Sequence, residues 1–482
     1  MTAKPETLTS LMTALDSSSD APFLLDSAGR VLATYGDAAR RSAQFAHAIR
    51  GAGAVPGDRL ALQADKSIDA LMVYLACVRS GTVLLPMNPA YTAAEVARLV
   101  ADAEPGLVVD NEGLAALAIS ADTCPTGFDD HPAAPDDLAA ILYTSGTTGL
   151  PKGSMLSQRN LASNARTLHR LWGFGPGDVL LHALPIFHTH GLFVATNCTI
   201  ANGTPMVLLA RFDLDDVLAA LPRCTVMMGV PTFYTRLLGD DRFDAALCKH
   251  MRVFISGSAP LLASVHEEFR ERTGHAILER YGMTETSMLT SNPLVGDRRP
   301  GTVGLALPDV EVRVTGEDSE VLGPAEIGGI EVRGPNVFDG YWRRPELRAS
   351  EFTADGFFRT GDVGRLDADG YLQIVGRSKD LIISGGLNVY PKEVEAVLDE
   401  LPGVLESAVI GVADADFGEA VVAVVVGDGT AVLDASALRA ASRERLASFK
   451  SPKLIYVVDA LPRNAMGKVE KAALRRTYGT PA

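Results

Sequence analysis

Short apolar runs alternate with segments of helical periodicity through the first half of the chain. Runs of strand length lie at residues 60–64, 82–85, 107–109, 140–143, 205–209, 225–230 and 253–256. Strands that alternate with helical patterns are typical of parallel α/β layers. The pattern therefore predicts a fold of the α/β class, built from layered α/β subdomains.

The pattern changes beyond about residue 290. Short strands then follow one another with Gly and Pro turns, at residues 310–315, 329–333 and 371–375. Closely spaced strands without helices between them indicate a small β-rich subdomain. We place this subdomain at about 290–378.

A second, smaller domain is predicted to begin at Lys379. It would hold a strand at 381–383, a Gly-Gly turn, a helix from Pro391 and an apolar strand at 420–426. Proline suits the first turn of a helix, where the missing N–H has no intrahelical partner. The predicted division is a large N-terminal domain, 1–378, and an α+β C-terminal domain, 379–482.

Length and composition narrow the class of protein. A chain of 482 residues exceeds what one hydrophobic core usually supports. The net charge of −15 argues against general nucleic-acid binding, although local fields can still attract a nucleotide. The five cysteines lack Cys-x-x-Cys spacing, and no run approaches the ~18 apolar residues of a membrane span. These features predict a cytoplasmic protein that binds neither nucleic acid nor membrane.

A loop rich in glycine and hydroxyls follows the apolar run before Tyr143. Residues 143–153 read Tyr-Thr-Ser-Gly-Thr-Thr-Gly-Leu-Pro-Lys-Gly, and a helix is expected from about Ser157. Glycines let backbone N–H groups approach an anion, hydroxyls add donors and a lysine adds charge. The loop lacks the Gly-Lys-Ser/Thr step of a Walker motif. It predicts a phosphate site made of Thr144, Ser145, Gly146, Thr147, Thr148, Gly149 and Lys152.

Further motifs, in order along the chain, give a resemblance to a known superfamily. They occupy residues 256–260, 279–285, 359–362, 376–380, 384–391 and 462–468. Together with the loop they resemble the acyl-adenylate-forming superfamily, which includes acyl-CoA synthetases, luciferases and peptide-synthetase adenylation domains. The runs at 184–193 and 229–236 are most similar to those of malonyl-CoA synthetases.

The resemblance implies a ligase that joins malonate, with methylmalonate as a further substrate, to coenzyme A through an acyl-adenylate, using ATP and Mg²⁺. It also implies that the C-terminal domain is mobile and rotates about a hinge at Lys379 between two half-reactions. The open alternatives are a ligase for acetate, propionate or succinate, an adenylation module that loads a carrier protein, and a catalytically silent nucleotide-binding protein.

Adenylation brings two anions together, so the site needs fixed positive charge where negative charge accumulates. Lys468 matches the superfamily's C-terminal lysine, which bridges the acyl carboxylate and the α-phosphate. Relatives regulate this lysine by acetylation, which removes its charge. An acetyltransferase and a deacetylase are therefore candidate partners.

The resemblance assigns the remaining nucleotide contacts residue by residue. Glu285 would hold Mg²⁺, which prefers hard oxygen ligands, and Thr284 would touch the α-phosphate. Asp362 would accept hydrogen bonds from both ribose hydroxyls, with Arg377 beside it. The adenine and the rest of the nucleotide would lie against Ser258, Ala259, Pro260, Glu279, Arg280, Tyr281, Gly282 and Met283.

The acyl pocket is assigned in the same way. His188 would form a gate, with Thr189 and His190 facing the acid; the histidine spacing does not match the i, i+4 pair of a zinc helix. Arg236 on an isolated helix would extend to solvent. The resemblance instead assigns it to the second carboxylate of a dicarboxylic acid, assisted by Arg280, which could equally serve the nucleotide.

The coenzyme A channel is predicted at a Gly-Gly turn. The resemblance assigns it to Ser384, Gly385, Gly386 and Leu387. Glycines would allow the narrow pantetheine arm to approach the backbone.

Overall fold

The computed structural model describes residues 7–17, 19–144, 151–384, 387–414, 417–464 and 467–479. Contacts group the chain into two compact units. The first comprises Met1–Glu311 and Val332–Phe358, and the second comprises Val312–Glu331 and Arg359–Ala482.

A nine-stranded sheet forms the centre of the first unit, in the order β14-β13-β12-β11-β10-β8-β9-β1-β2. The six strands from β12 to β1 run parallel, and antiparallel strands extend both ends. The strands are β1 (Pro22–Leu25), β2 (Val31–Thr34), β8 (Leu180–His182), β9 (Met206–Leu208), β10 (Val226–Gly229), β11 (Val253–Ser256), β12 (Leu278–Met283), β13 (Ser287–Ser291) and β14 (Leu305–Ala306).

A second sheet of the same unit has the order β5-β3-β4-β6-β7. Its first four strands are parallel, and β7 pairs antiparallel with β6, with Thr144 opposite Lys152. The strands are β3 (Arg59–Gln63), β4 (Val83–Pro86), β5 (Leu107–Asp110), β6 (Leu138–Thr144) and β7 (Lys152–Ser157).

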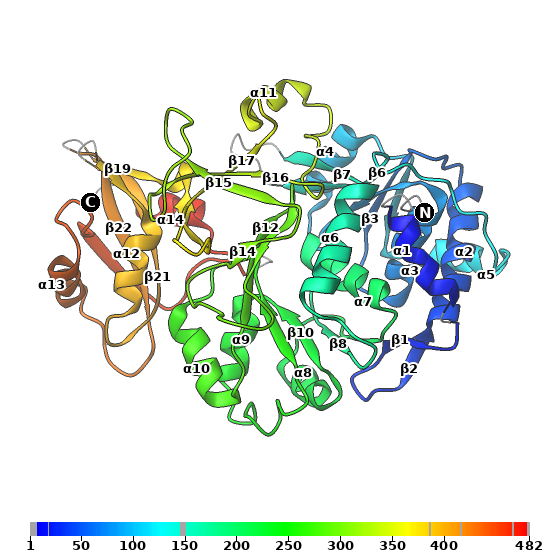
Figure 1. The fold of residues 1–482 in the computed structure, drawn as a ribbon, viewed down its shortest axis with the longest axis horizontal. Coiled ribbons are helices and arrows are strands. Elements are labelled where there is room, and N and C mark those ends of the chain that lie inside the picture. Colours follow the sequence, from blue (N-terminus) through cyan, green and yellow to red (C-terminus); the bar gives the residue numbers. More distant parts are fainter. Residues whose placement is uncertain are drawn as a thin grey trace. The chain divides into compact units, whose positions relative to one another are not determined.

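Helices cover these sheets, and their starts follow ordinary capping chemistry. Thr34, Thr92 and Ser157 each cap a helix through a capping box, which satisfies backbone N–H groups at the helix start. Figure 1 shows α9 beside β10 and α10 next to α9. The helices of this unit are α1 (Leu8–Ser17), α2 (Tyr35–Gly51), α3 (Ile68–Ser80), α4 (Ala93–Ala103), α5 (Asn111–Asp122), α6 (Gln158–Leu171), the π-helix η1 (His190–Thr196), α7 (Asn197–Asn202), α8 (Leu214–Ala220), η2 (Leu221–Arg223), α9 (Pro231–Leu238), α10 (Ala263–Thr273), η3 (Pro345–Leu347) and α11 (Arg348–Glu351).

The second unit holds most of a four-stranded sheet, β15-β16-β17-β18, and a five-stranded sheet in which β20, β19, β22 and β21 follow in order and β23 pairs with β22. The elements are β15 (Glu311–Thr315), β16 (Gly328–Arg333), β17 (Phe358–Leu366), β18 (Leu372–Arg377), η4 (Ser378–Asp380), β19 (Ile382–Ser384), β20 (Leu387–Val389), α12 (Pro391–Asp399), β21 (Val404–Asp414), β22 (Gly418–Gly427), α13 (Ala435–Arg445), β23 (Leu454–Val458) and α14 (Lys471–Tyr478).

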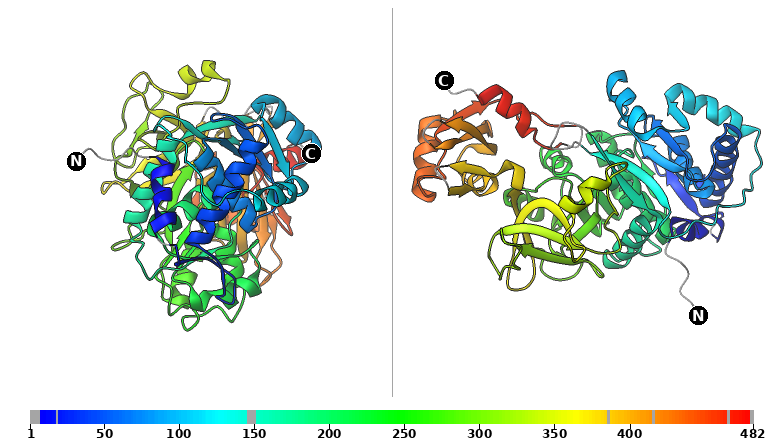
Figure 2. Two further views of the ribbon diagram at one scale, coloured as in Figure 1. Left: turned by 90° about the vertical axis from the view of Figure 1, so that its right-hand side faces the viewer. Right: turned by 90° about the horizontal axis from the view of Figure 1, so that it is seen from above.

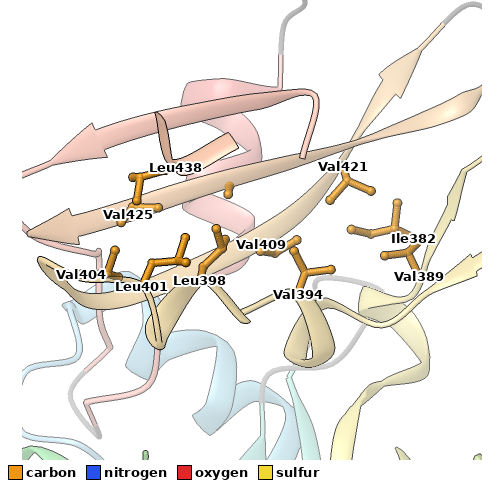
Figure 3. Close-up of a cluster of buried hydrophobic side chains, with 11 residues drawn as sticks. Ile382, Val389, Val394, Leu398, Leu401, Val404, Val409, Val421, Val425 and Leu438 are labelled. Carbon is orange, nitrogen blue, oxygen red and sulfur yellow. The ribbon is translucent and has the colours of Figure 1, made fainter. Parts of the chain in front are cut away.

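The second unit has a hydrophobic core of its own. Figure 3 shows apolar side chains of β21 and β22, among them Val409 and Val425, gathered with those of α12, such as Leu398. All three are fully buried. Burying such side chains is the main favourable term in folding.

The predicted α/β class and the helix expected near Ser157 are confirmed. The seven predicted strands of the first half are all present, within one or two residues at their ends. The sequence did not predict β7, and the contact grouping places the β-rich sheet largely with the C-terminal residues. The division at Lys379 stays a prediction. Within the described ranges, no helix has the length and apolar character needed to span a membrane.

Candidate active site

The carboxyl ends of β8, β10, β11 and β12 lie next to one another in the large sheet. These strands are parallel, so the segments that follow them leave from the same edge. Ligands of open α/β sheets bind at this edge. It carries the residues predicted for the acyl pocket and many of those predicted for the nucleotide.

Arg280, on β12, is the most unusual side chain at this edge. It is only 3% exposed, and its Nε and Nη2 atoms have no hydrogen-bond partner among the described residues. Its guanidinium lies against Gly257, where an added Cβ would come within 2.3 Å of Nη1. Burial lowers the pKa of Arg280 to about 9, so the group is still charged at neutral pH. A buried, unsatisfied guanidinium is a candidate for binding an anion.

His190 lies close to this guanidinium. Its Nδ1 atom is 3.3 Å from Oγ of Ser258, and Nε2 has no partner within the described chain. Burial, followed by the charge of Arg280, lowers the pKa of His190 well below its ordinary value. The imidazole is therefore neutral at pH 7. Thr189 is also buried, with an Oγ1 atom that no described residue satisfies.

Glu285 is the second buried charged group at this edge. Its Oε1 atom accepts hydrogen bonds from the hydroxyls of Thr144, at 3.3 Å, and Tyr341, at 3.1 Å. Glu285 is 4% exposed. The contact with Thr144 brings the end of β6, where the predicted phosphate loop begins, to the turn that follows β12.

The β12–β13 hairpin positions Thr284 and Glu285. A bulge interrupts the pairing between Tyr281 and Gly282. Any side chain at Gly282 would collide with the backbone, because an added Cβ would lie 1.9 Å from the carbonyl oxygen of Ser287. Tyr281, Gly282, Met283 and Thr284 are half-buried.

Lys152 stands at the start of β7, near the same carboxylate. Its Nζ forms a 3.0 Å ion pair with Glu351 of α11 and lies 4.9 Å from the ring centroid of Tyr341. Residues 340–342 pair along β7: Gly153 and Gly340 accept backbone bonds from Trp342 and Met155. This pairing brings Tyr341 to Lys152 and Glu285.

The segment after β11 has a strained backbone at Ser258, where φ is +71°. Non-glycine residues adopt this region at a cost of order 1–3 kcal/mol and cluster at functional sites. Ala259 is half-buried and Pro260 exposed. Glu279, on β12, is buried, and burial raises its pKa to about 8. Side chains alternate along a strand, so Glu279 and Arg280 point to opposite faces.

Arg236 is on the exposed face of α9, whereas a residue of a buried pocket would be on its buried face. Its side chain is exposed, and its guanidinium carbon is 5.9 Å from the ring centroid of Phe212. Phe233, on the same helix, is buried and stacks on Phe212. His188 is half-buried and accepts a 3.3 Å bond from the N–H of His190 at Nδ1. The roles of Arg236 and His188 stay predictions.

The second unit contains the other predicted nucleotide residues. Asp362 and Arg377 pair across β17 and β18, and their side chains form a 2.8 Å ion pair. Asp362 is 3% exposed. The two residues predicted for the ribose are therefore neighbours, although their role is untested.

Lys468 and Lys379 are both exposed, and Lys379 lies within η4. Ser384 is buried and pairs across the β19–β20 hairpin with Leu387, which is exposed. Several residues predicted for the phosphate loop and the coenzyme A turn lie outside the described residues: Ser145, Gly146, Thr147, Thr148, Gly149, Gly385 and Gly386.

The sequence did not predict two residues that contribute contacts at or near the site, Tyr341 and Lys66. Tyr341 is distant in sequence from Glu285, and the local signal for it was two adjacent aromatic residues, Tyr341 and Trp342, directly after Gly340. Lys66 donates from Nζ to Nδ1 and the carbonyl of His182, both at 2.8 Å, and to the carbonyl of Leu184 at 2.9 Å. These three acceptors match the three N–H bonds of an ammonium group.

The Lys66 contact continues toward the acyl pocket. Nε2 of His182 donates to the carbonyl of Gly191 at 2.9 Å, at the start of η1. Burial lowers the pKa of both Lys66 and His182 well below their ordinary values. The chain of bonds holds the segment between β8 and η1, which carries His188, and the start of η1, which carries His190.

Comparison with known proteins extends over most of the chain. A model of the AMP-binding enzyme family matches residues 13–342, and a model of the AMP-binding enzyme C-terminal domain matches residues 393–468. Among solved structures, ATP-bound MatB from Rhodopseudomonas palustris has a TM-score of 0.94 and 50% sequence identity, covering 98% of this chain and 99% of that chain.

Curated relatives act on different acids by name. A malonate–CoA ligase from Arabidopsis thaliana is 34% identical over 483 residues, covering 89% of this chain and 81% of the relative. A feruloyl-CoA synthase from an Amycolatopsis species is 37% identical over 471 residues, covering 94% and 95%. The motifs, the fold and these matches together confirm that the chain belongs to the AMP-binding enzyme family, within the adenylate-forming superfamily.

Proposed function

We propose that the protein is an AMP-forming acid–thiol ligase that joins malonate to coenzyme A. In the first half-reaction a malonate carboxylate oxygen attacks the α-phosphorus of ATP. The new O–P bond replaces the bond to the bridging oxygen, and pyrophosphate leaves. The thiolate of coenzyme A then attacks the activated carbonyl carbon, a C–S bond forms, and AMP leaves with the electrons of the broken C–O bond.

The buried guanidinium of Arg280 carries the choice of substrate. Malonate has a second carboxylate, which would supply acceptors for the unsatisfied Nε and Nη2 atoms and a counter-charge for the buried cation. In the neutral tautomer that carries its proton on Nε2, His190 would donate a hydrogen bond to the same acid. A monocarboxylic acid would leave the buried charge of Arg280 unpaired. An unpaired buried charge costs free energy, so such an acid would bind more weakly than malonate.

Similarity alone distinguishes the acids less sharply. The malonate–CoA ligase and the feruloyl-CoA synthase match this chain at 34% and 37% identity. The 50% identity to MatB, over nearly the full length of both chains, supports the use of ATP, which that structure holds. The charge in the pocket and the match to the malonate–CoA ligase support the same acid, with methylmalonate as a further substrate that shares both carboxylates.

Glu285 is the proposed Mg²⁺ ligand. It offers hard carboxylate oxygens beside the predicted phosphate loop, and Mg²⁺ is commonly held by one or two carboxylates together with substrate phosphates. The bound ion would neutralise charge on the phosphates. Thr144 and Tyr341 fix the carboxylate by hydrogen bonds. For Lys152 to bind a phosphate, its ion pair with Glu351 must open.

Lys468 is the proposed source of positive charge between the attacking carboxylate and the α-phosphate. We further propose that the C-terminal domain rotates about Lys379 after adenylation, so that the turn at 384–387 can receive coenzyme A. Acetylation of Lys468 would remove its charge and stop the first step. A cytoplasmic location stays a prediction from the sequence.

The decisive experiment measures acid-dependent AMP formation from ATP, Mg²⁺ and coenzyme A. The acids are malonate, methylmalonate, succinate, acetate, propionate, octanoate and ferulate. Arg280→Met removes the buried charge at similar length, and Arg236→Met is its matched control on α9. We expect malonate to be the preferred acid of the wild type, and Arg280→Met to lower kcat/KM for malonate by at least ~100-fold.

Three results discriminate between the possibilities. Preference for acetate, octanoate or ferulate in the wild type would overturn the substrate assignment. If Arg236→Met lowers kcat/KM for malonate strongly and Arg280→Met does not, the second carboxylate of malonate binds Arg236, as the sequence predicted, and not Arg280. In Lys468→Ala, adenylate formation should fall far more than thioester formation from supplied malonyl-adenylate; equal losses would remove Lys468 from its assigned step.

A further inference from the structure

The last helix of the described chain, α14, begins three residues after Lys468. Residues 471, 474, 475 and 478 share one face of it, because they recur at i, i+3, i+4 and i+7. Leu474 is 2% exposed and packs in a cluster with Leu461, and the ring of Tyr478 is 4.6 Å from that of Tyr456. Figure 2 shows α14, in red, beside the orange strands of the same unit.

Two ion pairs complete this face. Nζ of Lys471 is 2.7 Å from Oε1 of Glu395 on α12, and Nη2 of Arg475 is 2.8 Å from Oδ1 of Asp380 in η4. The Glu395 side chain is 2% exposed, and it also pairs with Lys392 at 2.7 Å. Apolar contacts and ion pairs therefore fix both the position of α14 and its rotation about its own axis.

The backbone leading into α14 is also fixed. Arg463 and Val469 form a bridge, and the N–H of Asn464 donates to the carbonyl of Lys468 at 2.9 Å. In return, the N–H of Lys468 donates to Oδ1 of Asn464 at 3.0 Å. The guanidinium of Arg463 contacts Glu406 of β21. Lys468 thus lies in a loop that hydrogen bonds between Asn464 and Lys468 close, and the chain enters the first turn of α14 directly after this loop.

We infer that Lys471 and Arg475 are positioning residues for Lys468. The inference rests on the proposed role of Lys468 in adenylation. They touch no reacting atom, but they hold the end of the loop that carries Lys468. An error of about 1 Å in the placement of a catalytic group can lower a rate by about 100-fold.

The contact with Asp380 adds a connection to the predicted hinge. Asp380 follows Lys379 in η4, so Arg475 ties α14 to this turn. The loop of Lys468 and the turn at Lys379 therefore belong to one body within the second unit. Any rotation about Lys379 would carry Lys468 with it at a fixed distance from the turn.

The test separates the two half-reactions in the full-length protein. Malonate-dependent exchange of pyrophosphate into ATP reports adenylation, and malonyl-CoA formation from supplied malonyl-adenylate reports the second step. The variants are Lys471→Met, Arg475→Gln, the double variant and Lys468→Ala. Arg476→Gln removes the same charge from the exposed side of α14 and is the matched control.

We expect each single variant to lower exchange by about 10-fold and the double variant by about 100-fold, while the second step changes by less than about twofold. Arg476→Gln should behave as wild type, and Arg475→Lys should recover most of the exchange, because an ammonium can still pair with Asp380. The fold should survive Lys471→Met, since Glu395 keeps Lys392 and the N–H of Val409 as partners.

Wild-type exchange in Lys471→Met and Arg475→Gln would overturn the inference, as would equal losses in both half-reactions. If Lys468→Ala collapses exchange while these variants do not, the positioning role fails and the proposed function stands. If Lys468→Ala exchanges normally, the role of Lys468 fails, and the inference falls with it.

Discussion

Two carboxyl groups on α12 have pKa values shifted in opposite directions. Burial alone would raise the pKa of Glu395, but Lys392 and Lys471 lower it to about 2. Burial raises the pKa of Asp399 to about 7, and its Oδ1 atom has no hydrogen-bond partner in the described chain. Glu395 therefore stabilises the second unit above about pH 4, whereas an ionised Asp399 destabilises it.

The sign of the Asp399 effect follows from proton binding. An aspartate in the unfolded chain has a pKa of about 3.9. Between about pH 4 and pH 7 the folded protein keeps a proton that the unfolded chain has lost, so stability falls as pH rises through this window. Below about pH 4 both states are protonated at this group, and the penalty disappears.

Asp399→Asn should stabilise the protein by an amount that depends on pH. The gain should grow from about pH 4, level off above about pH 7 and reach about 1–3 kcal/mol there, because the amide cannot ionise. Urea unfolding of the full chain across this range measures it. Asp318→Asn, at an exposed position, is the control and should leave the curve unchanged. A constant gain at every pH would show that packing, not ionisation, is responsible.

At the scale of single residues, sequence and structure differ most over the two arginines. Arg236 fits a helical face in the sequence, and its burial depends on what covers that helix. Arg280 lies on a short strand with a glutamate beside it, which suggests a neutralising pair. Only the alternation of side chains along β12 separates the two charges and leaves Arg280 without its neighbour. Lys66 and Tyr341 have partners more than 50 residues away, so no local pattern reveals them.

At the scale of elements, the π-helix η1 is held at its start by close contacts of Gly191. Gly191 is the second residue of η1, and a Cβ added there would lie 2.1 Å from the carbonyl oxygen of Pro185. The carbonyl of Gly191 accepts from His182 and, at 3.1 Å, from the hydroxyl of Thr196. π-Helical turns frequently occur at functional sites. This one carries His190.

Gly191→Ala should therefore move the start of η1 and displace His190. We expect a loss of stability of about 1–3 kcal/mol from overpacking. We also expect a KM for malonate raised by about 10-fold or more, with little change in the KM for ATP. Gly51→Ala, at the end of α2 where nothing lies within 4 Å of an added Cβ, is the control. Unchanged kinetics in Gly191→Ala would show that η1 does not position the acid.

Elements with a clear period were predictable, and those with mixed composition were not. The buried strands of the first half are apolar runs, and the N-cap residue Ser157 marks the start of α6. The strand β7 reads Lys-Gly-Ser-Met-Leu-Ser, which has neither strand alternation nor an apolar run. Its pairing with β6 and with residues 340–342 makes it a strand. Tertiary pairing of this kind overrides local propensity.

At the scale of the whole molecule, each unit has its own buried core. Leu398 belongs to the core of the second unit, shown in Figure 3, and Leu237 is fully buried in the first. Chains with separate cores commonly unfold in more than one step. The division into units thus predicts two thermal transitions.

A matched pair of substitutions tests this division. Leu398→Ala and Leu237→Ala remove the same atoms from the two cores and should each lower the stability of one unit by about 2–5 kcal/mol. Calorimetry should show that each variant shifts a different transition. A single transition, lowered equally by both variants, would show that the units unfold together.

The hairpin of β6 and β7 has a consequence for changing the specificity of this protein. The two ends of the predicted phosphate loop, Thr144 and Lys152, are fixed by the smaller sheet, whereas the segments predicted to line the acid follow β8 and β10 of the larger one. A mutant library confined to those two segments would therefore search for other dicarboxylic acids without disturbing the two ends of the phosphate loop. Substitutions on β12 would be excluded from it, because that strand and its hairpin carry Arg280 and Glu285 together. The separation of the two sheets would thus let the acid preference change while both ends of the phosphate loop stay in place.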